Sequence, residues 1–154
     1  MNSRDLARKN LDRRFAELKP IDRWTQPPKG WLRAIRDAIG MTTAQMAARL
    51  GVSQPRIITL EKDETRGVLS LETLSRAAQV LDCTLVYALV PNQSLDHMVR
   101  RRADQIAAAR IARVDHSMRL ENQGLSKQDL QAEHRRLTEE LLQGNLRRIW
   151  DEPA

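Results

Sequence analysis

Residues 42–60 read TTAQMAARLGVSQPRIITL, and this stretch carries the strongest structural signal in the chain. Apolar side chains recur at helical spacing on both sides of a glycine, at Met46, Leu50, Ile57 and Leu60. Ala47 is small enough to let two helices touch, and Gly51 suits a turn in which φ is positive. The pattern predicts two short helices that cross at a steep angle and are joined by a tight turn.

Residues that favour the N-cap position mark where each of the two predicted helices begins. Thr42 or Thr43 can cap the first helix, and Ser53 can cap the second. Pro55 falls in the first turn of the second helix, where its missing N–H costs little. A helix-turn-helix unit of this kind places its second helix, here residues 53–62, in the major groove of DNA. Sequence-specific DNA binding is therefore the leading hypothesis.

The second helix must turn Ile57 and Leu60 toward the core, which leaves its other side chains facing outward. We predict that four of these outward residues read bases: Gln54, Pro55, Arg56 and Thr59. Gln54 can pair with adenine, and Arg56 can make a bidentate contact to guanine. Pro55 has no donor and offers only an apolar contact. The alternative for Arg56 is a phosphate contact.

A second set of residues lies where phosphate groups are expected: Thr43, Arg49, Ser53, Lys62 and Arg66. Such contacts position a protein on DNA without reading its sequence. Arg66 falls in a predicted polar loop at residues 62–67, where Asp63 and Glu64 are interpreted as solvated turn residues. The densest basic cluster, residues 100–102, is interpreted as a solvated helix face, with nucleic-acid contact as the alternative.

The chain divides into three predicted parts. Residues 1–29 form a basic, helical N-terminal arm and a proline-rich linker, and residues 30–91 form the helix-turn-helix domain. Residues 84–90 (TLVYALV) are rich in β-branched and aromatic side chains and predict a short strand. Because a lone strand is unstable, the same strand of a second subunit is its simplest partner. Residues 92–154 form a helical extension for dimerisation or partner binding.

Composition limits the class of protein. The chain has 154 residues and a net charge of +6, with 26 Lys plus Arg against 20 Asp plus Glu. Residues 1–29 are the most cationic part, with 8 basic and 4 acidic side chains. A basic excess favours polyanionic partners. Cys83 is the only cysteine, which excludes an intramolecular disulfide and fits a reducing cytosol.

We expect a cytoplasmic protein without a membrane partner. The longest apolar run, residues 85–90, is far shorter than the roughly 20 residues of a membrane-spanning helix. No apolar region of a secretory signal follows the start of the chain.

The residues that would carry catalysis or bind a metal do not form known patterns. His97, His116 and His134 are not spaced as helical metal-ligand pairs, and no nucleophile elbow or glycine-rich phosphate loop occurs. We therefore predict no enzyme activity, no metal site and no cofactor.

The chain resembles the Cro/C1-type, or Xre-like, helix-turn-helix family in residues 40–61 (GMTTAQMAARLGVSQPRIITLE) and 70–82 (SLETLSRAAQVLD). This resemblance implies a mainly α-helical, lambda-repressor-like domain of four or five helices in a dimeric repressor. A five-helix domain has a helix where this sequence predicts a strand.

A narrower resemblance covers most of the chain. The stretches GWLRAIRDAIGMT (30–42), LDCTLVYALVP (81–91) and MRLENQ (118–123) are similar to the subfamily called mobile mystery protein A. Its members lie on mobile elements beside a gene for a Fic-domain protein. The resemblance therefore implies a regulator, or an antitoxin, of an operon that encodes a Fic-domain partner.

The expected protein is a homodimeric repressor that binds double-stranded DNA at a palindromic operator. The first alternative is an antitoxin whose C-terminal helices bind a Fic-domain partner, in which case Leu130, Leu137 and Leu141 should be exposed. The second is a helical module that makes no DNA contact.

Overall fold

The computed structural model describes residues 3–121 and 124–151. It divides the chain into two compact units, one of residues 19–89 and one of residues 1–18 together with 90–154. Asn122 and Gln123, at the end of the MRLENQ stretch, lie outside the described residues. The described elements are all helical, which confirms the predicted mainly α-helical class, and none of them is long and apolar enough to cross a membrane.

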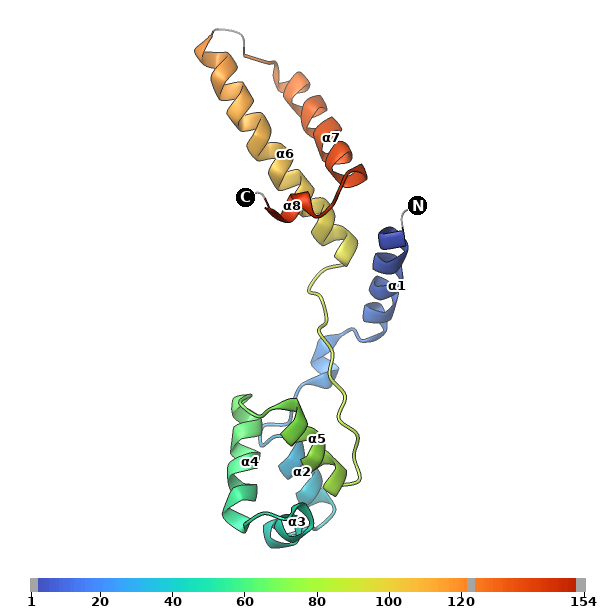
Figure 1. The fold of residues 1–154 in the computed structure, drawn as a ribbon, viewed down its shortest axis with the longest axis vertical. Coiled ribbons are helices and arrows are strands. Elements are labelled where there is room, and N and C mark those ends of the chain that lie inside the picture. Colours follow the sequence, from blue (N-terminus) through green and yellow to red (C-terminus); the bar gives the residue numbers. More distant parts are fainter. Residues whose placement is uncertain (1–2, 122–123, 152–154) are drawn as a thin grey trace. The chain divides into compact units, whose positions relative to one another are not determined.

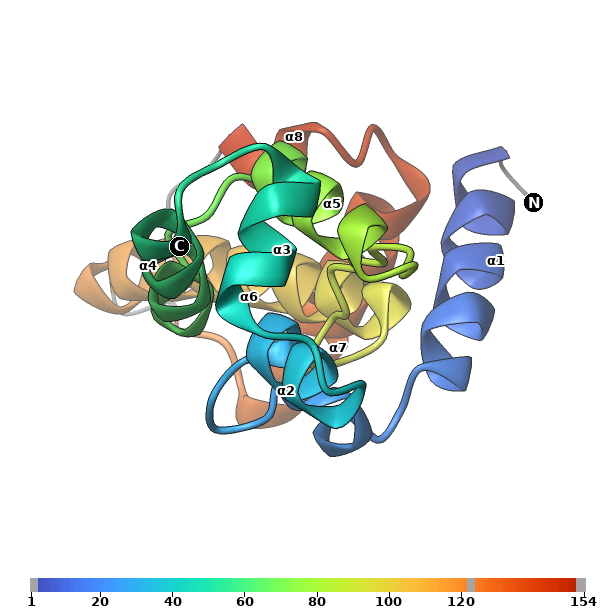
Figure 2. The ribbon, with the colours of Figure 1, turned by 90° about the horizontal axis from the view of Figure 1, so that it is seen from below.

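The unit of residues 19–89 holds the helix-turn-helix. Its elements are η1 (Ile21–Trp24), α2 (Trp31–Ala38), α3 (Thr43–Leu50), α4 (Gln54–Arg66) and α5 (Leu71–Val80). In both views α4 lies along one side of the unit and α3 lies across its end (Figure 1; Figure 2). The buried core is formed by Leu32, Met46, Ala47, Ile57, Leu60, Ala77 and Leu81. Four of these residues belong to the stretch that predicts the fold.

The turn between α3 and α4 has the predicted geometry. Thr42 caps α3 through a capping box, in which its hydroxyl accepts from the Gln45 amide at 3.1 Å and the Gln45 side chain accepts from the Thr42 amide at 2.9 Å. Gly51 ends α3 in the left-handed region, with φ at 73°. Ser53 is the N-cap residue of α4, but its side chain makes no capping hydrogen bond.

The recognition helix is longer than the sequence prediction. A polar loop was expected at residues 62–67, but α4 continues to Arg66 and ends at Gly67, whose φ is 68°. Its inward face continues past Leu60 through Glu61 and Glu64, which are both buried. The prediction of a loop is wrong because the last turns of α4 are held to α2 by acidic side chains, whereas the sequence pattern relies on apolar ones.

The predicted strand at residues 84–90 is also wrong. This segment is extended but pairs with no other segment in the part of the chain that the structure describes. Val86, Tyr87 and Leu89 are 84 %, 71 % and 87 % exposed. A single chain provides no second edge to which their backbone can bond, so no ladder forms.

The second unit is a helical hairpin with two further helices packed against it. Helices α6 (Leu95–Leu120) and α7 (Lys127–Gln143) run side by side, and α1 (Ser3–Glu17) and α8 (Arg148–Asp151) pack on α6 (Figure 1). Ala103, Ile106 and Ala107 of α6 are buried. The buried Thr138 of α7 donates to Asp104 of α6 at 3.0 Å, which ties the two long helices together.

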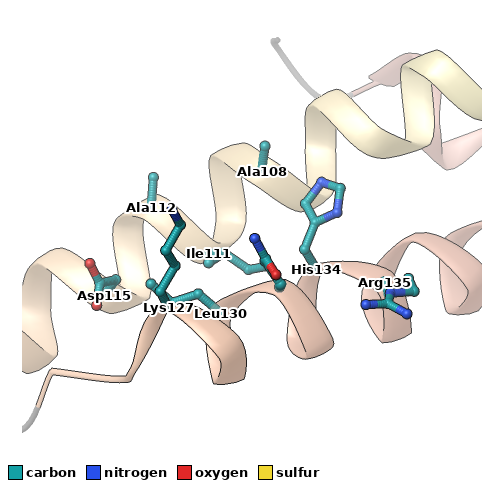
Figure 3. Close-up of a pocket in the computed structure, with 9 residues that line it drawn as sticks. Ala108, Ile111, Ala112, Asp115, Lys127, Leu130, His134 and Arg135 are labelled. Atoms are coloured by element: carbon teal, nitrogen blue, oxygen red, sulfur yellow. The ribbon is translucent and has the colours of Figure 1, made fainter.

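An open recess of about 570 Å³ lies between α6 and α7. Ile111 of α6 and Leu130 of α7 form its apolar part, and His134 extends from α7 toward α6 (Figure 3). The His134 ring nitrogen Nε2 lies 3.2 Å from the carbonyl oxygen of Asp104. The side chain therefore helps to close the hairpin.

The N-terminal helix is joined to the C-terminal hairpin by a carboxylate. Asp12 of α1 accepts hydrogen bonds from the amides of Leu95 and Asp96, at 2.7 and 3.2 Å, at the start of α6. These amides have no partner within their own helix. Asp12 therefore caps α6 across more than eighty residues of sequence, together with the local N-cap Ser94.

We predict that Asp12→Ala lowers the stability of this unit by about 1–2 kcal/mol, because two amides of α6 lose a charged acceptor. Amide hydrogen exchange of residues 95–110 measures the effect. Glu17→Ala, at the exposed end of the same helix, is the control. Equal exchange in the two variants would show that the cap does not stabilise α6.

Candidate nucleic-acid interface

The outward face of α4 is open to solvent. All four residues that the sequence assigns to base reading are exposed: Gln54, Pro55, Arg56 and Thr59. On the opposite face Ile57 and Leu60 are 0 % and 2 % exposed. The helix therefore presents polar groups from its first two turns and keeps its apolar groups in the core.

Gln54 is held by the preceding helix. Its side-chain nitrogen Nε2 donates to the hydroxyl Oγ1 of Thr43 at 2.8 Å, so the first residue of α4 is joined to the first residue of α3. The bond leaves the carbonyl oxygen of the Gln54 amide and the proton of the Thr43 hydroxyl for other partners. The structure thus brings together one residue predicted to read bases and one predicted to contact phosphate.

The hydroxyl of Thr59 points along its own helix. It donates to the carbonyl oxygen of Pro55 at 3.1 Å, which leaves the Thr59 methyl group as the part that can make apolar contacts. Arg56 is exposed in the first turn of α4, and its amide donates to the carbonyl of Ser53 at 3.0 Å.

The residues predicted to contact phosphate lie on α3, in the turn before α4 and on α4 itself. Thr43 begins α3, Arg49 is exposed in its last turn, and Ser53 precedes α4. Lys62 is exposed in the middle of α4. Arg66 belongs to the last turn of α4, not to a loop, and lies 3.3 Å from the Asp63 carboxylate.

A buried ion pair fixes the inner side of α4. Glu61 accepts from the Nε of Arg36 at 2.6 Å and from its Nη2 at 3.3 Å, which is a two-point contact between α4 and α2. Both residues are less than 8 % exposed. The hydrogen bond to Glu61 raises the pKa of Arg36 above its ordinary value, so the guanidinium stays charged. Its Nη1 also donates to the carbonyl of Met41 at 2.9 Å.

A second carboxylate, one turn later, caps α2. Glu64 accepts from the amides of Trp31 and Leu32 at 2.9 and 3.0 Å. A negative charge at a helix N-terminus is favourable because it meets unpaired amides and the positive end of the helix dipole. The interpretation of Glu64 as a solvated turn residue is wrong, since it is only 7 % exposed.

Gly30 permits this close approach. Its φ is 83°, and a Cβ placed on it would lie 2.6 Å from a carboxylate oxygen of Glu64. Any larger residue would both strain the backbone and displace the carboxylate that caps α2. The glycine therefore belongs to the support of α4, although it lies 34 residues earlier in the sequence.

Sequence reasoning missed these supporting residues, although the sequence contains a signal for them. Glu61 and Glu64 follow Ile57 at the fourth and seventh positions, which continue the buried face of a helix. Charged residues are rarely buried unless they are paired, so a pattern of apolar residues alone does not indicate them. Arg36 lies between Leu32 and Ile39 on α2 and was missed for the same reason.

The chain matches one known family by sequence. Residues 32–87 match the Helix-turn-helix family, and this part of the chain is a Cro/C1-type, or Xre-like, domain. The matched residues contain α3, α4 and α5 and all of α2 except Trp31, and they include the exposed face of α4. This match supports a DNA-binding transcription regulator. No curated protein and no solved structure matches the chain.

Acidic, histidine and cysteine side chains do not gather into a metal site in the described ranges 3–121 and 124–151. The two buried acidic residues of α4, Glu61 and Glu64, are engaged with Arg36 and with the amides of α2. Their chemistry is structural support for the recognition helix.

We predict that Glu61→Ala destabilises the unit of residues 19–89 by about 2–3 kcal/mol, because the buried Arg36 guanidinium loses its two-point contact and keeps only the half-exposed Asp37 carboxylate, 2.8 Å from its Nη1. Amide hydrogen exchange of α2 and α4 measures this loss. Glu72→Ala, in the exposed first turn of α5, is the matched control and should cost less than about 1 kcal/mol. Similar losses in both variants would contradict the role of the pair.

Proposed function

We propose that this protein is a sequence-specific repressor that binds double-stranded DNA as a homodimer, at a palindromic operator of its own operon on a mobile element. The observation that carries the proposal is that α4 has one exposed polar face and one buried face that is fixed to α2. Its outer face exposes Gln54, Arg56 and Thr59, while its inner face is anchored by Glu61 and Glu64. A rigidly held helix with exposed polar groups in its first turns is suited to the major groove.

The base-reading roles follow from the donors and acceptors on this face. Gln54 presents an amide to adenine, Arg56 a two-point donor to guanine, and Pro55 and the Thr59 methyl group apolar contacts to thymine. The bond from Gln54 to Thr43 supports the first of these roles, because an oriented side chain loses less entropy on binding.

The phosphate contacts are assigned to residues around the same face. Thr43, Arg49, Ser53, Lys62 and Arg66 supply hydroxyl groups and cations, and they position the helix without reading sequence. The Ser53 side chain makes no capping hydrogen bond, so its hydroxyl remains able to contact a phosphate, which supports the assigned role. Binding should weaken as salt rises.

The homodimer is supported by apolar surface that one chain leaves uncovered. Val86, Tyr87 and Leu89 form an exposed run directly before the helical extension of residues 92–154. We assign the contact between subunits to this run and to the extension. Two-fold symmetry would then place two copies of α4 in half-sites about one helical turn apart, roughly 34 Å.

A second role as an antitoxin that binds a Fic-domain protein stays a prediction. It requires the apolar stripe of Leu130, Leu137 and Leu141 to be available to a partner. These three side chains are half-buried in the described structure, and Leu130 lines the recess between α6 and α7. Co-purification of a neighbouring gene product with the intact protein would favour this role.

We predict that Arg56→Ala weakens binding to the cognate site by about 1–3 kcal/mol and weakens binding to random DNA much less, because the lost contact is to a base. Equilibrium titration of both duplexes at one salt concentration measures the difference. Arg76→Ala, which removes an exposed arginine of α5, is the charge-matched control. Equal losses on the two duplexes would show that Arg56 touches only phosphate.

We also predict that the protein retains a small set of genomic fragments at physiological salt and that these share a palindromic sequence next to its own gene. Sequencing of the retained fragments tests whether they share a palindromic operator. The mass of the protein–DNA complex tests whether two chains bind to it. A random set of fragments would contradict sequence-specific binding. A single half-site bound by one chain would contradict the homodimer.

A further inference from the structure

A polar recess of about 420 Å³ lies beside α4 within the unit of residues 19–89. It is built from the turn before α2, from α2 itself, from the start of α3 and from one stripe of α4. The residues that line it are Pro28, Lys29, Arg33, Arg36, Thr43, Ile58, Glu61, Lys62 and Thr65. None of the roles assigned so far involves Lys29 or Arg33.

The recess has an excess of positive charge. Lys29, Arg33 and Lys62 are exposed at its rim, whereas the charge of Arg36 is balanced by the buried Glu61. Arg33 lies 3.6 Å from Asp37, but both side chains are about half exposed, and such pairs contribute little. An anion entering the recess would therefore meet three cations and no unbalanced carboxylate among the lining residues.

The position of Lys29 is fixed relative to α4. The Gly30 amide donates to the Pro27 carbonyl at 2.9 Å, which closes a four-residue turn with Pro28 and Lys29 in the middle. Pro28 restricts the backbone of this turn. Gly30 then packs against Glu64 of α4, which also bonds the next two amides. The turn is thus tied to the helix predicted to enter the groove.

The recess continues the proposed DNA-binding face. Ile58, Lys62 and Thr65 occur at spacings of four and three, so they form the stripe of α4 that borders the recess. Thr43, which bonds Gln54 on the outer face, also lines it. If α4 lies in the major groove and a DNA strand contacts Thr43, the next phosphates of that strand would therefore lie close to this recess.

We propose that Lys29 and Arg33, together with Lys62, form a binding site for consecutive phosphates of one DNA strand beside the recognition helix. This inference rests on the proposed function. The ligand is held by side chains and not by the N-terminus of α2, because the Glu64 carboxylate already occupies the amides of Trp31 and Leu32. Like other phosphate contacts, the site adds affinity and register but no base specificity.

The test compares the salt dependence of DNA binding in the full-length protein. The double variant Lys29→Gln/Arg33→Gln is titrated with a retained genomic duplex and with a random duplex between about 50 and 200 mM salt. Loss of two phosphate contacts should reduce the slope of log K against log salt by about 1.8 on both duplexes. The charge-preserving variant Lys29→Arg/Arg33→Lys should keep the slope of the unchanged protein.

The matched control is Lys19→Gln/Arg76→Gln, which removes the same charges from exposed positions of the same unit outside the recess. Equal slopes in the unchanged protein and the Lys29/Arg33 variant would overturn the inference. An equal reduction in the control would also overturn it, because the effect would then reflect net charge alone. Melting curves confirm that each variant remains folded.

Two further outcomes separate the inference from its alternatives. If inorganic phosphate raises the melting temperature of the unchanged protein but not of the Lys29/Arg33 variant, while the DNA slopes are equal, the recess binds a free anion and the DNA assignment fails. If the unchanged protein binds no duplex at any salt concentration, the proposed function fails as well. If the unchanged protein binds DNA in a salt-dependent way and the Lys29/Arg33 variant has the same slope, the phosphate site at Lys29 and Arg33 is wrong but the proposed function is not.

Discussion

The attachment of α4 to α2 by two carboxylates is the interaction on which the DNA-binding unit depends. Glu61 bonds the buried Arg36 guanidinium, and Glu64 bonds two amides at the start of α2. Buried charges are costly unless they are paired and hydrogen-bonded, and both carboxylates meet that condition. Because the contacts lie one turn apart on the same face, they fix the rotation of α4 about its own axis as well as its position.

Fixing that rotation determines which side chains can meet DNA. With Glu61 and Glu64 inward, the first two turns of α4 must expose Gln54, Arg56 and Thr59. The capping box of α3 and the left-handed Gly51 set the angle at which the helices meet, and the bond from Gln54 to Thr43 joins their first residues. The interface is therefore organised before any ligand binds, which limits the entropy lost on association.

The helix-turn-helix could be predicted from sequence because its core follows simple rules. Ala47, Gly51 and Ile57 each have one plausible role, namely close contact, a positive φ and an apolar face. Periodicity failed where charge replaced hydrophobicity: Glu64 is buried, whereas Ile39, the C-cap residue of α2, is 57 % exposed. The strand prediction failed because β propensity describes a pleated surface with a partner, and residues 84–90 have none in one chain. The bond from Asp12 to α6 links positions that no local pattern connects.

The most direct test of the account is a two-dimensional NMR titration of the full-length protein with a retained duplex. We expect the largest shifts at the side-chain amide of Gln54 and at the backbone amides between Gly51 and Thr59, Pro55 excepted, with little change at the Glu64-bonded amides of Trp31 and Leu32. Shifts confined to α6 and α7, with the amides of α4 unchanged, would contradict it.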